Sequence, residues 1–413
     1  MTLVQKLFYF KKIYGIDSRT SYIKTHQIMK YIINQLKFQR QLFSSTPNNN
    51  ELLKVGEKIQ NAIEQLQHPN NCSESPILVC QLDDYCSFGV AMHHISYCLS
   101  IASGIGRTLI YKDNKAWTYN ATWEEMFKNI SRCNYDQHVK PFLSDSAVYS
   151  SSEQLKRILF LRNRDEMYLL NKTELPQIPE AVPKSLEHFL RKYHSNPPAW
   201  FQGQLFKYAW KLTENLELKV RQAYAQIPFE CGPVIGISHR RTDKYVNSRF
   251  FKLDEYILSI LEELVQHIKK RRTKEALIEL NSDIFILSKC QFVVCTFSNN
   301  ICRIVYELMQ TFGDATDKVH SMDYFYAEHS QNIKMVAIAD YFPQQDRSII
   351  QEEISLKKGD IIEVTGPIQN DGFVNGRKLL NDFPQNINKI PIYLLRNHYL
   401  SANFTNFMNI ELN

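Results

Sequence analysis

The stretch Pro-Val-Ile-Gly-Ile-Ser-His-Arg-Arg-Thr-Asp-Lys, residues 233–244, decides the fold of this chain. Its apolar first half is typical of a buried strand, and a basic loop follows at once. The charged or titratable side chains of that loop are His239, Arg240, Arg241, Asp243 and Lys244. Because open α/β sheets bind ligands at the carboxyl ends of their strands, this loop suits a diphosphate and indicates a nucleotide-linked substrate. The alternative is an exposed basic turn that binds nothing.

Strands and helices alternate on both sides of this loop, which predicts an α/β fold. The expected helices are 91–103, 186–193, 214–225 and 299–312, and the expected strands are 107–111 and 292–297. We therefore expect a doubly wound, Rossmann-type nucleotide-binding half. The helix at 299–312 should direct its N-terminal amides to the same edge as the basic loop.

Composition places the chain among ordinary globular proteins. Its 413 residues can form two or three domains with a large core. The formal charge is only +6, with 49 basic and 43 acidic residues interspersed, so we expect no nucleic-acid partner. The densest basic run, 269–272, stands where a helix should end, and cations there oppose the negative end of the helix dipole.

Cysteine content and sequons indicate the secretory lumen. The chain has nine cysteines, and Asn-x-Ser/Thr sequons occur at Asn71, Asn120, Asn129, Asn171 and Asn403. No uncharged apolar run approaches the roughly 18 residues of a membrane span. The sequence thus predicts either a start downstream of a natural membrane anchor or a chain that is not lumenal.

Residues 1–70 are expected to be helical and coiled-coil-like. An apolar stripe at spacings of three and four runs along the second of these helices through Leu52, Val55, Ile59, Ile63 and Leu66. The stripe can pair with another helix, which would make a homodimer, or it can pack onto the following domain. Both alternatives are open at this point.

The C-terminal part differs from the rest because short strands are separated by turn signals. The expected strands lie within 335–341, 356–364, 371–373 and 390–394. This pattern predicts a small all-β barrel.

Taken together, these stretches resemble the α-1,6-fucosyltransferase family, whose members add core fucose to N-glycans. The resemblance is strongest over residues 234–244 and over 293–311, which read Val-Val-Cys-Thr-Phe-Ser-Asn-Asn-Ile-Cys-Arg-Ile-Val-Tyr-Glu-Leu-Met-Gln-Thr. A weaker likeness covers 92–110. The resemblance as a whole implies a GT-B-like glycosyltransferase with a C-terminal SH3-like barrel. The implied parts are a helical segment at 1–70, a glycosyltransferase domain at 71–330, an SH3-like domain at 331–398 and a C-terminal tail at 399–413.

The resemblance also implies a reaction. It is inverting transfer of fucose from GDP-fucose to the innermost GlcNAc of an N-glycan, without a metal ion, in the Golgi lumen. By the same resemblance Arg240 and Arg241 grip the donor diphosphate, and Asp243 and Lys244 complete the loop. The further donor-pocket positions are Tyr256, Asp283 and Asn299, the last of which replaces the family's serine.

The resemblance pairs six of the cysteines as Cys72 with Cys133, Cys80 with Cys98, and Cys295 with Cys302. Cys86, Cys231 and Cys290 are left without an assigned partner. His93 and His94 are adjacent and point to different helix faces, so we expect core or surface histidines rather than metal ligands.

The chain departs from the family at the position of the catalytic base. Inverting transfer needs a group that takes the acceptor proton, usually a carboxylate. Asn247 and Ser248 stand where the family has a glutamate, and neither is a base near neutral pH. Asp254 or Glu255 can replace the missing carboxylate base only if the loop bends. A catalytically impaired lumenal relative that binds nucleotide sugar or glycan is therefore the alternative function, and a cytosolic SH3 adaptor is a weaker third.

A second departure lies between residues 273 and 291. This connection has room for about one short helix, whereas the family has an additional strand and helices there. The shortening reflects either a real deletion or an incomplete gene model. In the barrel, Asn370 replaces the tryptophan that a groove for Pro-rich peptides needs, which favours structural support or acceptor contact over peptide binding.

Overall fold

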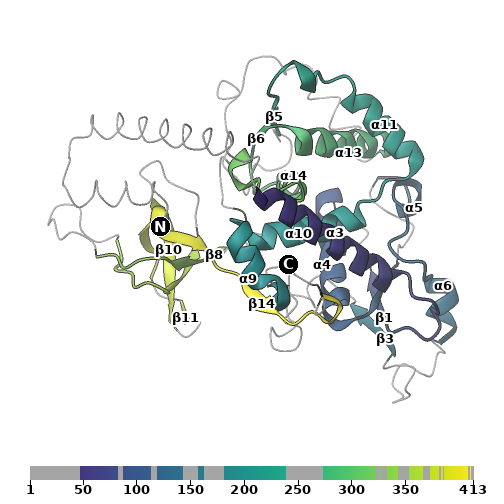
Figure 1. Cartoon of the computed structure of the whole chain (residues 1–413), viewed down its shortest axis with the longest axis horizontal. Helices are drawn as coiled ribbons and strands as arrows, with labels where there is room; N and C mark the ends of the chain where they lie inside the picture. Colours follow the sequence, from purple (N-terminus) through teal and green to yellow (C-terminus); the bar gives the residue numbers. More distant parts are fainter. Residues whose placement is uncertain are drawn as a thin grey trace. The chain divides into compact units, whose positions relative to one another are not determined.

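The computed structural model describes residues 47–81, 87–112, 119–142, 157–161, 181–238, 273–321, 326, 333–342, 353–365, 373–380, 383–384, 386–407 and 410. These residues divide into a larger unit, within Asn50–Met322 and Leu400–Asn413, and a smaller one within Asp323–Tyr399 (Figure 1). None of the helices in the described ranges combines the length and the apolar character that crossing a membrane requires.

The larger unit contains a first parallel sheet with strand order β2-β1-β3. Its strands are β1 (Ile77–Gln81), β2 (Thr108–Lys112) and β3 (Ile158–Leu161). Helix α4 (Phe88–Ile105) joins β1 to β2 and ends at Gly106, whose left-handed φ of 66° lets its amide donate to the Ala102 carbonyl. The helix expected at 91–103 and the strand expected at 107–111 are confirmed.

A second parallel sheet has the order β5-β6-β7. Its strands are β5 (Ile235–Ile237), β6 (Phe292–Cys295) and β7 (Val319–Ser321). Helix α13 (Lys274–Lys289) leads into β6, and α14 (Asn300–Gln310) joins β6 to β7. The strand and helix expected after the basic loop are confirmed. Between residues 273 and 292 the chain forms one helix and no strand, in agreement with the length argument.

Strand β5 corrects one expectation, because it is not a buried strand. Gly236 faces α13 so closely that a Cβ there would lie 2.6 Å from the Leu287 side chain. Since side chains alternate along a strand, Ile235 and Ile237 point to the other face, where they are 63% and 46% exposed. Among the described strands β5 pairs only with β6, so it forms an edge of the sheet.

Helix α10 (Pro197–Ala209) packs against α14 and α4, and the sequence reading missed it. Trp200 and Phe201 are buried on it. A Cβ on Gly203 would lie 2.2 Å from the Glu307 carbonyl oxygen, so only glycine allows this approach to α14. The flanking helices α9 (Lys184–Tyr193) and α11 (Glu214–Tyr224) agree with expectation.

Helix α3 (Pro47–Gln67) carries the apolar stripe, which was expected either to pair with another helix or to pack onto the following domain. Leu52, Val55, Ile59 and Ile63 are buried within this chain. The Gln60 side chain donates to the backbone oxygen of Gln204 on α10 at 2.8 Å. The stripe packs onto the following domain, and a homodimer through the N-terminal helices loses its support from these residues.

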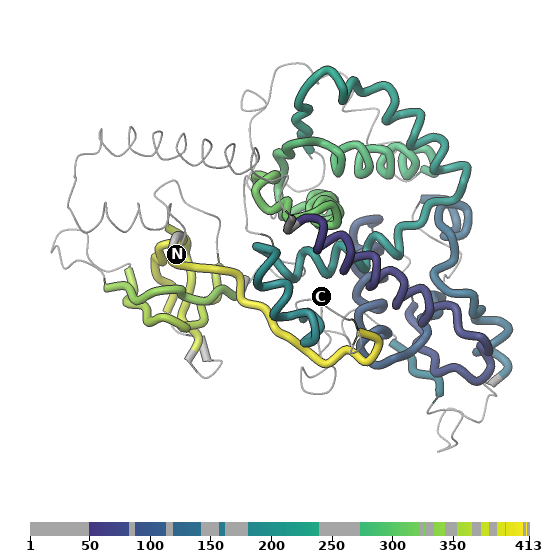
Figure 2. Tube along the Cα trace, viewed as in Figure 1, coloured from purple at the N-terminus to yellow at the C-terminus, as the bar shows by residue number. Residues whose placement is uncertain are grey.

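The last residues form part of the larger unit rather than a separate tail. Strand β14 (Leu400–Ala402) pairs in parallel with β4 (Ala181–Pro183), and the yellow trace in Figure 2 shows it beside teal α9. The turn η7 (Thr405–Phe407) follows. Phe404 and Phe407 are buried edge-on against Phe201, with ring centroids 5.3 and 5.7 Å apart, which explains why the chain returns here.

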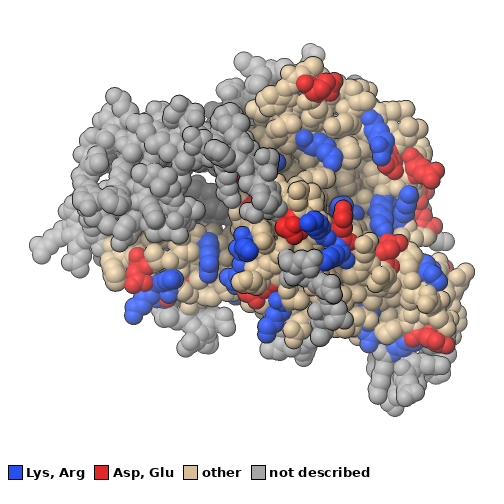
Figure 3. All heavy atoms as spheres, viewed as in Figure 1, with Lys and Arg blue, Asp and Glu red and all other residues tan. Residues whose placement is uncertain are grey.

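The larger unit also contains short helical elements. These are α5 (Trp123–Met126), α6 (Tyr135–His138), η1 (Lys140–Phe142), η3 (Phe229–Cys231) and η5 (Thr316–Lys318). On the face shown in Figure 3, its basic and acidic side chains are interspersed, as the composition indicates.

The smaller unit is an antiparallel sheet with the order β11-β10-β9-β8-β13, and β12 also pairs with β10. Its elements are β8 (Ile333–Ala337), β9 (Ile361–Val364), β10 (Phe373–Leu380), β11 (Phe383–Pro384), β12 (Asn388–Pro391), η6 (Ile392–Leu394) and β13 (Leu395–Asn397). Leu356, Ile362, Val374 and Ile390 lie in its core. The small all-β unit is confirmed.

A buried histidine makes the larger unit sensitive to acid. The His194 Nδ1 accepts a hydrogen bond from the Asn196 amide at 2.9 Å. Burial lowers the pKa of His194 from 6.5 to about 4, although the Asp314 carboxylate acts in the opposite direction. The unfolded chain therefore binds more protons than the folded chain between pH 6.5 and 4, and stability falls as the pH falls through this range.

We expect this histidine to remove about 2 kcal/mol of stability between pH 7 and pH 5. Urea unfolding at both pH values should show a smaller loss for His194→Gln, which does not titrate. His188→Gln, which changes an exposed histidine on the preceding helix α9, serves as the control and should behave like the unchanged chain. Equal pH slopes for all three proteins would contradict this assignment.

Candidate active site

The carboxyl ends of β5, β6 and β7 lie at one edge of the second sheet. Ile237 is level with Val294, and Cys295 is level with Ser321. The Ser238 amide donates to the Val294 carbonyl at 3.0 Å, so the chain is still in register where β5 ends. The basic loop begins at the next residue and therefore starts from this edge.

The N-terminus of α14 lies at the same edge. Asn299 caps the helix, and its Oδ1 accepts a hydrogen bond from the Ile301 amide at 3.1 Å. The Cys295–Cys302 disulfide fastens the end of β6 to the first turn of the helix. Because the first amides of a helix lack intrahelical acceptors and carry the positive end of its dipole, this end favours an anion.

The N-terminus of α4 meets that of α14. A Cβ on Gly89 would lie only 2.6 Å from the Asn300 Cβ, so the two helices are in close contact there. The Phe88 amide donates to the buried Tyr119 hydroxyl at 3.0 Å, which fixes the first turn of α4. Since α4 follows β1 as α14 follows β6, the carboxyl edges of the two parallel sheets adjoin.

A buried polar pair holds these helices together. The His93 Nε2 on α4 lies 3.1 Å from the Glu307 Oε1 on α14, and both side chains are buried. The His93 Nδ1 donates to the Gly89 carbonyl at 2.7 Å, because a carbonyl can only accept. Nε2 and Oε1 must therefore share one further proton. The pair, which sequence reasoning missed, fixes α4 relative to α14.

Two of the predicted donor residues, Asn299 and Asp283, lie in the described part of the chain. Asn299 is buried at the N-terminus of α14. Asp283 lies within α13, and its side chain is exposed. Seven residues fall outside the described ranges: Arg240, Arg241, Asp243, Lys244, Asn247, Ser248 and Tyr256. The loop that carries the first four begins after Ser238, the residue that follows the end of β5 at Ile237.

All three implied disulfides are present. Cys72 pairs with Cys133, Cys80 with Cys98, and Cys295 with Cys302. The first joins the segment before β1 to the segment before α6, and the other two each fasten a strand to the helix that follows it. Cys231 is exposed and Cys290 is buried, and both are free thiols.

This arrangement has the features of a nucleotide site, and comparison with known proteins identifies the family. A family model described as the alpha-(1,6)-fucosyltransferase N- and catalytic domains matches residues 12–267 and 263–327. The chain belongs to the α-(1,6)-fucosyltransferase family. Membership makes it a glycosyltransferase. The two matched stretches meet at 263–267, which lies just before the connection where the sequence predicts a missing part of the family fold.

Two relatives carry the family's name. An alpha-(1,6)-fucosyltransferase of Caenorhabditis elegans is 29% identical over 88% of this chain and 72% of its own length. An alpha-(1,6)-fucosyltransferase of Drosophila melanogaster is 26% identical over 76% of this chain and 56% of its own length. The chain thus spans between about half and three quarters of these fucosyltransferases.

Proposed function

We propose that the chain transfers fucose from GDP-fucose to the innermost GlcNAc of N-glycans, in core fucosylation. The observation that carries the proposal is the meeting of two features at one sheet edge. The loop with Arg240 and Arg241 leaves β5 directly after Ser238, and the N-terminus of α14 lies at the end of the neighbouring strand β6. The match to the fucosyltransferase family supports a fucose donor.

The chemistry follows from the leaving group. When the glycosidic bond of the donor breaks, negative charge develops on the diphosphate. Two guanidinium groups can each bind it bidentately, and the helix amides add a fixed partial positive charge. These groups are most effective when they are already oriented before the charge develops. In this proposal Lys244 adds positive charge, Asp243 completes the loop, and Tyr256, Asp283 and Asn299 belong to the donor pocket.

Proton removal from the acceptor separates the two candidate functions. Asn247 and Ser248 occupy the position of the family's base, and neither side chain holds a carboxylate. This observation favours the second candidate, a catalytically impaired relative that binds the nucleotide sugar or glycan without turnover. Asp254 and Glu255 are the nearest acids that can replace the base if the first candidate is correct.

We further propose a GT-B-like arrangement for the larger unit and an SH3-like one for the smaller. Two separate parallel sheets whose carboxyl edges adjoin support the former, and a small antiparallel sheet around one apolar core supports the latter. The three disulfides support a location in the Golgi lumen. We propose transfer without a metal ion, so a chelator should leave the rate unchanged.

The test of the donor site is Arg240→Ala. Loss of one oriented donor to a developing anion should lower kcat/KM about 100- to 1,000-fold, which is about 3 to 4 kcal/mol of barrier. The measurement is fucose transfer from GDP-fucose to a core N-glycopeptide, together with a GDP titration. Arg221→Ala is the matched control, because Arg221 is exposed on α11 and pairs with Glu217 one helix turn earlier.

The outcomes separate the proposals. Transfer that is lost in Arg240→Ala and kept in Arg221→Ala supports the transferase. GDP binding that depends on Arg240, without transfer by the unchanged chain, supports the impaired relative. Unchanged GDP binding in Arg240→Ala would refute the assignment of the diphosphate to this loop.

A further inference from the structure

Two glycosylation sequons lie at one corner of the larger unit. Asn71 begins the sequence Asn-Cys-Ser, and Asn129 begins the sequence Asn-Ile-Ser. A disulfide joins the two sequons, because Cys72 is the middle residue of the first and Cys133 follows the second by two residues. Both asparagines are exposed. This corner therefore presents two asparagine side chains to solvent from a crosslinked base.

The turn at Asn71 orients its amide group. The Ser73 amide donates to the Asn71 Oδ1 at 3.0 Å, which makes an Asx turn. The Nδ2 is the other branch of the same planar amide, so it points away from this hydrogen bond. Ser73 is exposed as well, so the residue whose hydroxyl the sequon requires also lies at the surface.

The corner lies at the amino ends of the strands of the first sheet. The Ser131 hydroxyl donates to the Gln67 carbonyl at 2.8 Å, and the Leu109 amide near the start of β2 donates to the Gln67 Oε1 at 2.9 Å. The candidate active site lies at the opposite, carboxyl ends. The sequon at Asn120 differs, because the adjoining Tyr119 bonds the first turn of α4 at that site. A bulky polar glycan at the corner therefore leaves the candidate active site open.

The order of synthesis gives the first sequon time to react before its cysteine is crosslinked. Cys72 and Cys133 are 61 residues apart. At about 5 to 20 residues per second, synthesis reaches Cys133 roughly 3 to 12 s after Cys72. The second sequon has less time. In the folded chain Ser131 is buried and its hydroxyl is bonded to backbone, so this sequon must react before the corner folds.

We propose that Asn71 and Asn129 carry N-linked glycans. In the attachment step the amide nitrogen of the asparagine forms a bond to the first sugar carbon of an oligosaccharide held on a lipid diphosphate. The bond from that carbon to the diphosphate oxygen breaks, and the lipid diphosphate leaves with the electron pair. One amide proton passes to a base of the transferring enzyme. The proposal rests on the lumenal location proposed above, and it is independent of the sugar donor that the chain itself uses.

The experiment measures the occupancy of each sequon in the full chain, secreted from animal cells behind an added signal sequence. A glycosidase that releases N-glycans is applied in heavy-oxygen water, which converts each glycosylated asparagine into a heavy aspartate. Mass spectrometry then gives the occupancy, and non-reducing peptide mapping follows the Cys72–Cys133 bridge. We expect a glycan on both asparagines, with higher occupancy at Asn71 than at Asn129 because its sequon has more time to react.

Asn134 is a matched control within the same chain. Its Oδ1 accepts a hydrogen bond from the Asp136 amide at 2.8 Å, so it makes the same turn as Asn71 and is likewise exposed. It should stay unmodified, because an aspartate stands where the sequon needs serine or threonine. Ser73→Ala should abolish the glycan at Asn71 and keep the other. Asn129→Gln should have the reverse effect.

Each outcome decides the proposal. A protein that contains the Cys72–Cys133 bridge but no glycan at Asn71 and Asn129 would overturn it. Absence of both the glycans and the bridge would contradict the lumenal location together with the proposal. Equal amounts of heavy aspartate at Asn134 and Asn71 would show chemical deamidation instead of glycosylation. Fucose transfer is assayed separately, so a chain with both glycans and no transfer would contradict the proposed function alone.

Discussion

Replacing Glu307 with alanine should destabilise the larger unit by about 3 to 5 kcal/mol, because it leaves a buried partner without its counterpart. His93 and Glu307 are 3.1 Å apart, and Glu307 is fully buried. After truncation the His93 Nε2 has lost the group with which it shared a proton, and water does not reach it readily. Urea unfolding followed by circular dichroism measures the loss.

Three comparisons make this prediction specific. Glu307→Gln should cost less than Glu307→Ala, since its amide can still donate to the His93 Nε2. In a double-mutant cycle the loss for Glu307→Ala with His93→Ala should be smaller than the sum of the single losses. Glu217→Ala removes the exposed ion pair with Arg221 and should cost less than about 1 kcal/mol. Additive losses at positions 93 and 307 would show that the pair is not coupled.

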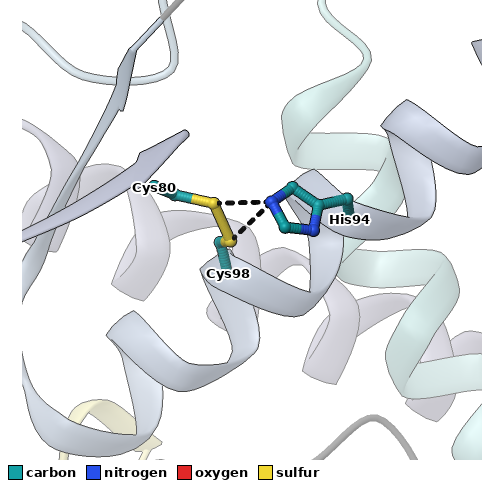
Figure 4. A group of neighbouring side chains, drawn as sticks. All are labelled: Cys80, His94 and Cys98. Atoms are coloured by element: carbon teal, nitrogen blue, oxygen red, sulfur yellow. Dashed lines mark hydrogen bonds between the residues drawn. A yellow bond between two sulfur atoms is a disulfide. The ribbon is translucent and has the colours of Figure 1, made fainter. Parts of the chain in front are cut away.

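The His93–Glu307 pair also explains a limit of sequence reasoning. The two residues are 214 positions apart, and nothing in either helix by itself indicates that they meet. A 3.6-residue period indicates which face of a helix is buried but not which helix covers it. The spacing of His93 and His94 indicates only that they are not a helical pair of metal ligands. In the structure His93 contacts Glu307, and His94 contacts the Cys80–Cys98 bridge (Figure 4).

Local signals predicted the strands and helices around the basic loop well. Strand β6 follows from the apolar run at 292–295, and helix α14 follows from a helical run after Asn299, which is also a good N-cap. Helix α10 has apolar and aromatic residues on all sides because it is surrounded by other helices, so it lacks the amphipathic period that identifies a surface helix. Its two prolines stand in the first helical turn, where proline is acceptable.

Burial depends on what covers an element, which the local sequence does not encode. The apolar residues of β5 predicted a buried strand, yet Ile235 and Ile237 are exposed at a sheet edge. The stripe on α3 was compatible with two partners, and the structure buries Leu52, Val55, Ile59 and Ile63 of the stripe within the same chain. The disulfides could be anticipated only from the resemblance, since six cysteines alone allow 15 pairings.

Removing the Cys72–Cys133 disulfide by a double change to alanine should cost about 4 kcal/mol, because the bridge closes a long loop in the unfolded chain. The two cysteines are 61 residues apart in sequence, and both are buried beside Ile77 and Val139 in one apolar cluster. Without the bridge the unfolded ensemble gains the conformations that the crosslink forbids, while the native contacts of β1 remain available.

The Cys295–Cys302 bridge provides a matched comparison within the same unit. It closes a loop of only 7 residues, so the same change to alanine there should cost about 2.5 kcal/mol. Urea unfolding of both double variants under identical oxidising conditions tests the order. If the short-loop variant lost more stability than the long-loop variant, the entropy of the unfolded chain would not be the main contribution. The bridge at α14 would then act chiefly by holding the folded helix N-terminus at the sheet edge.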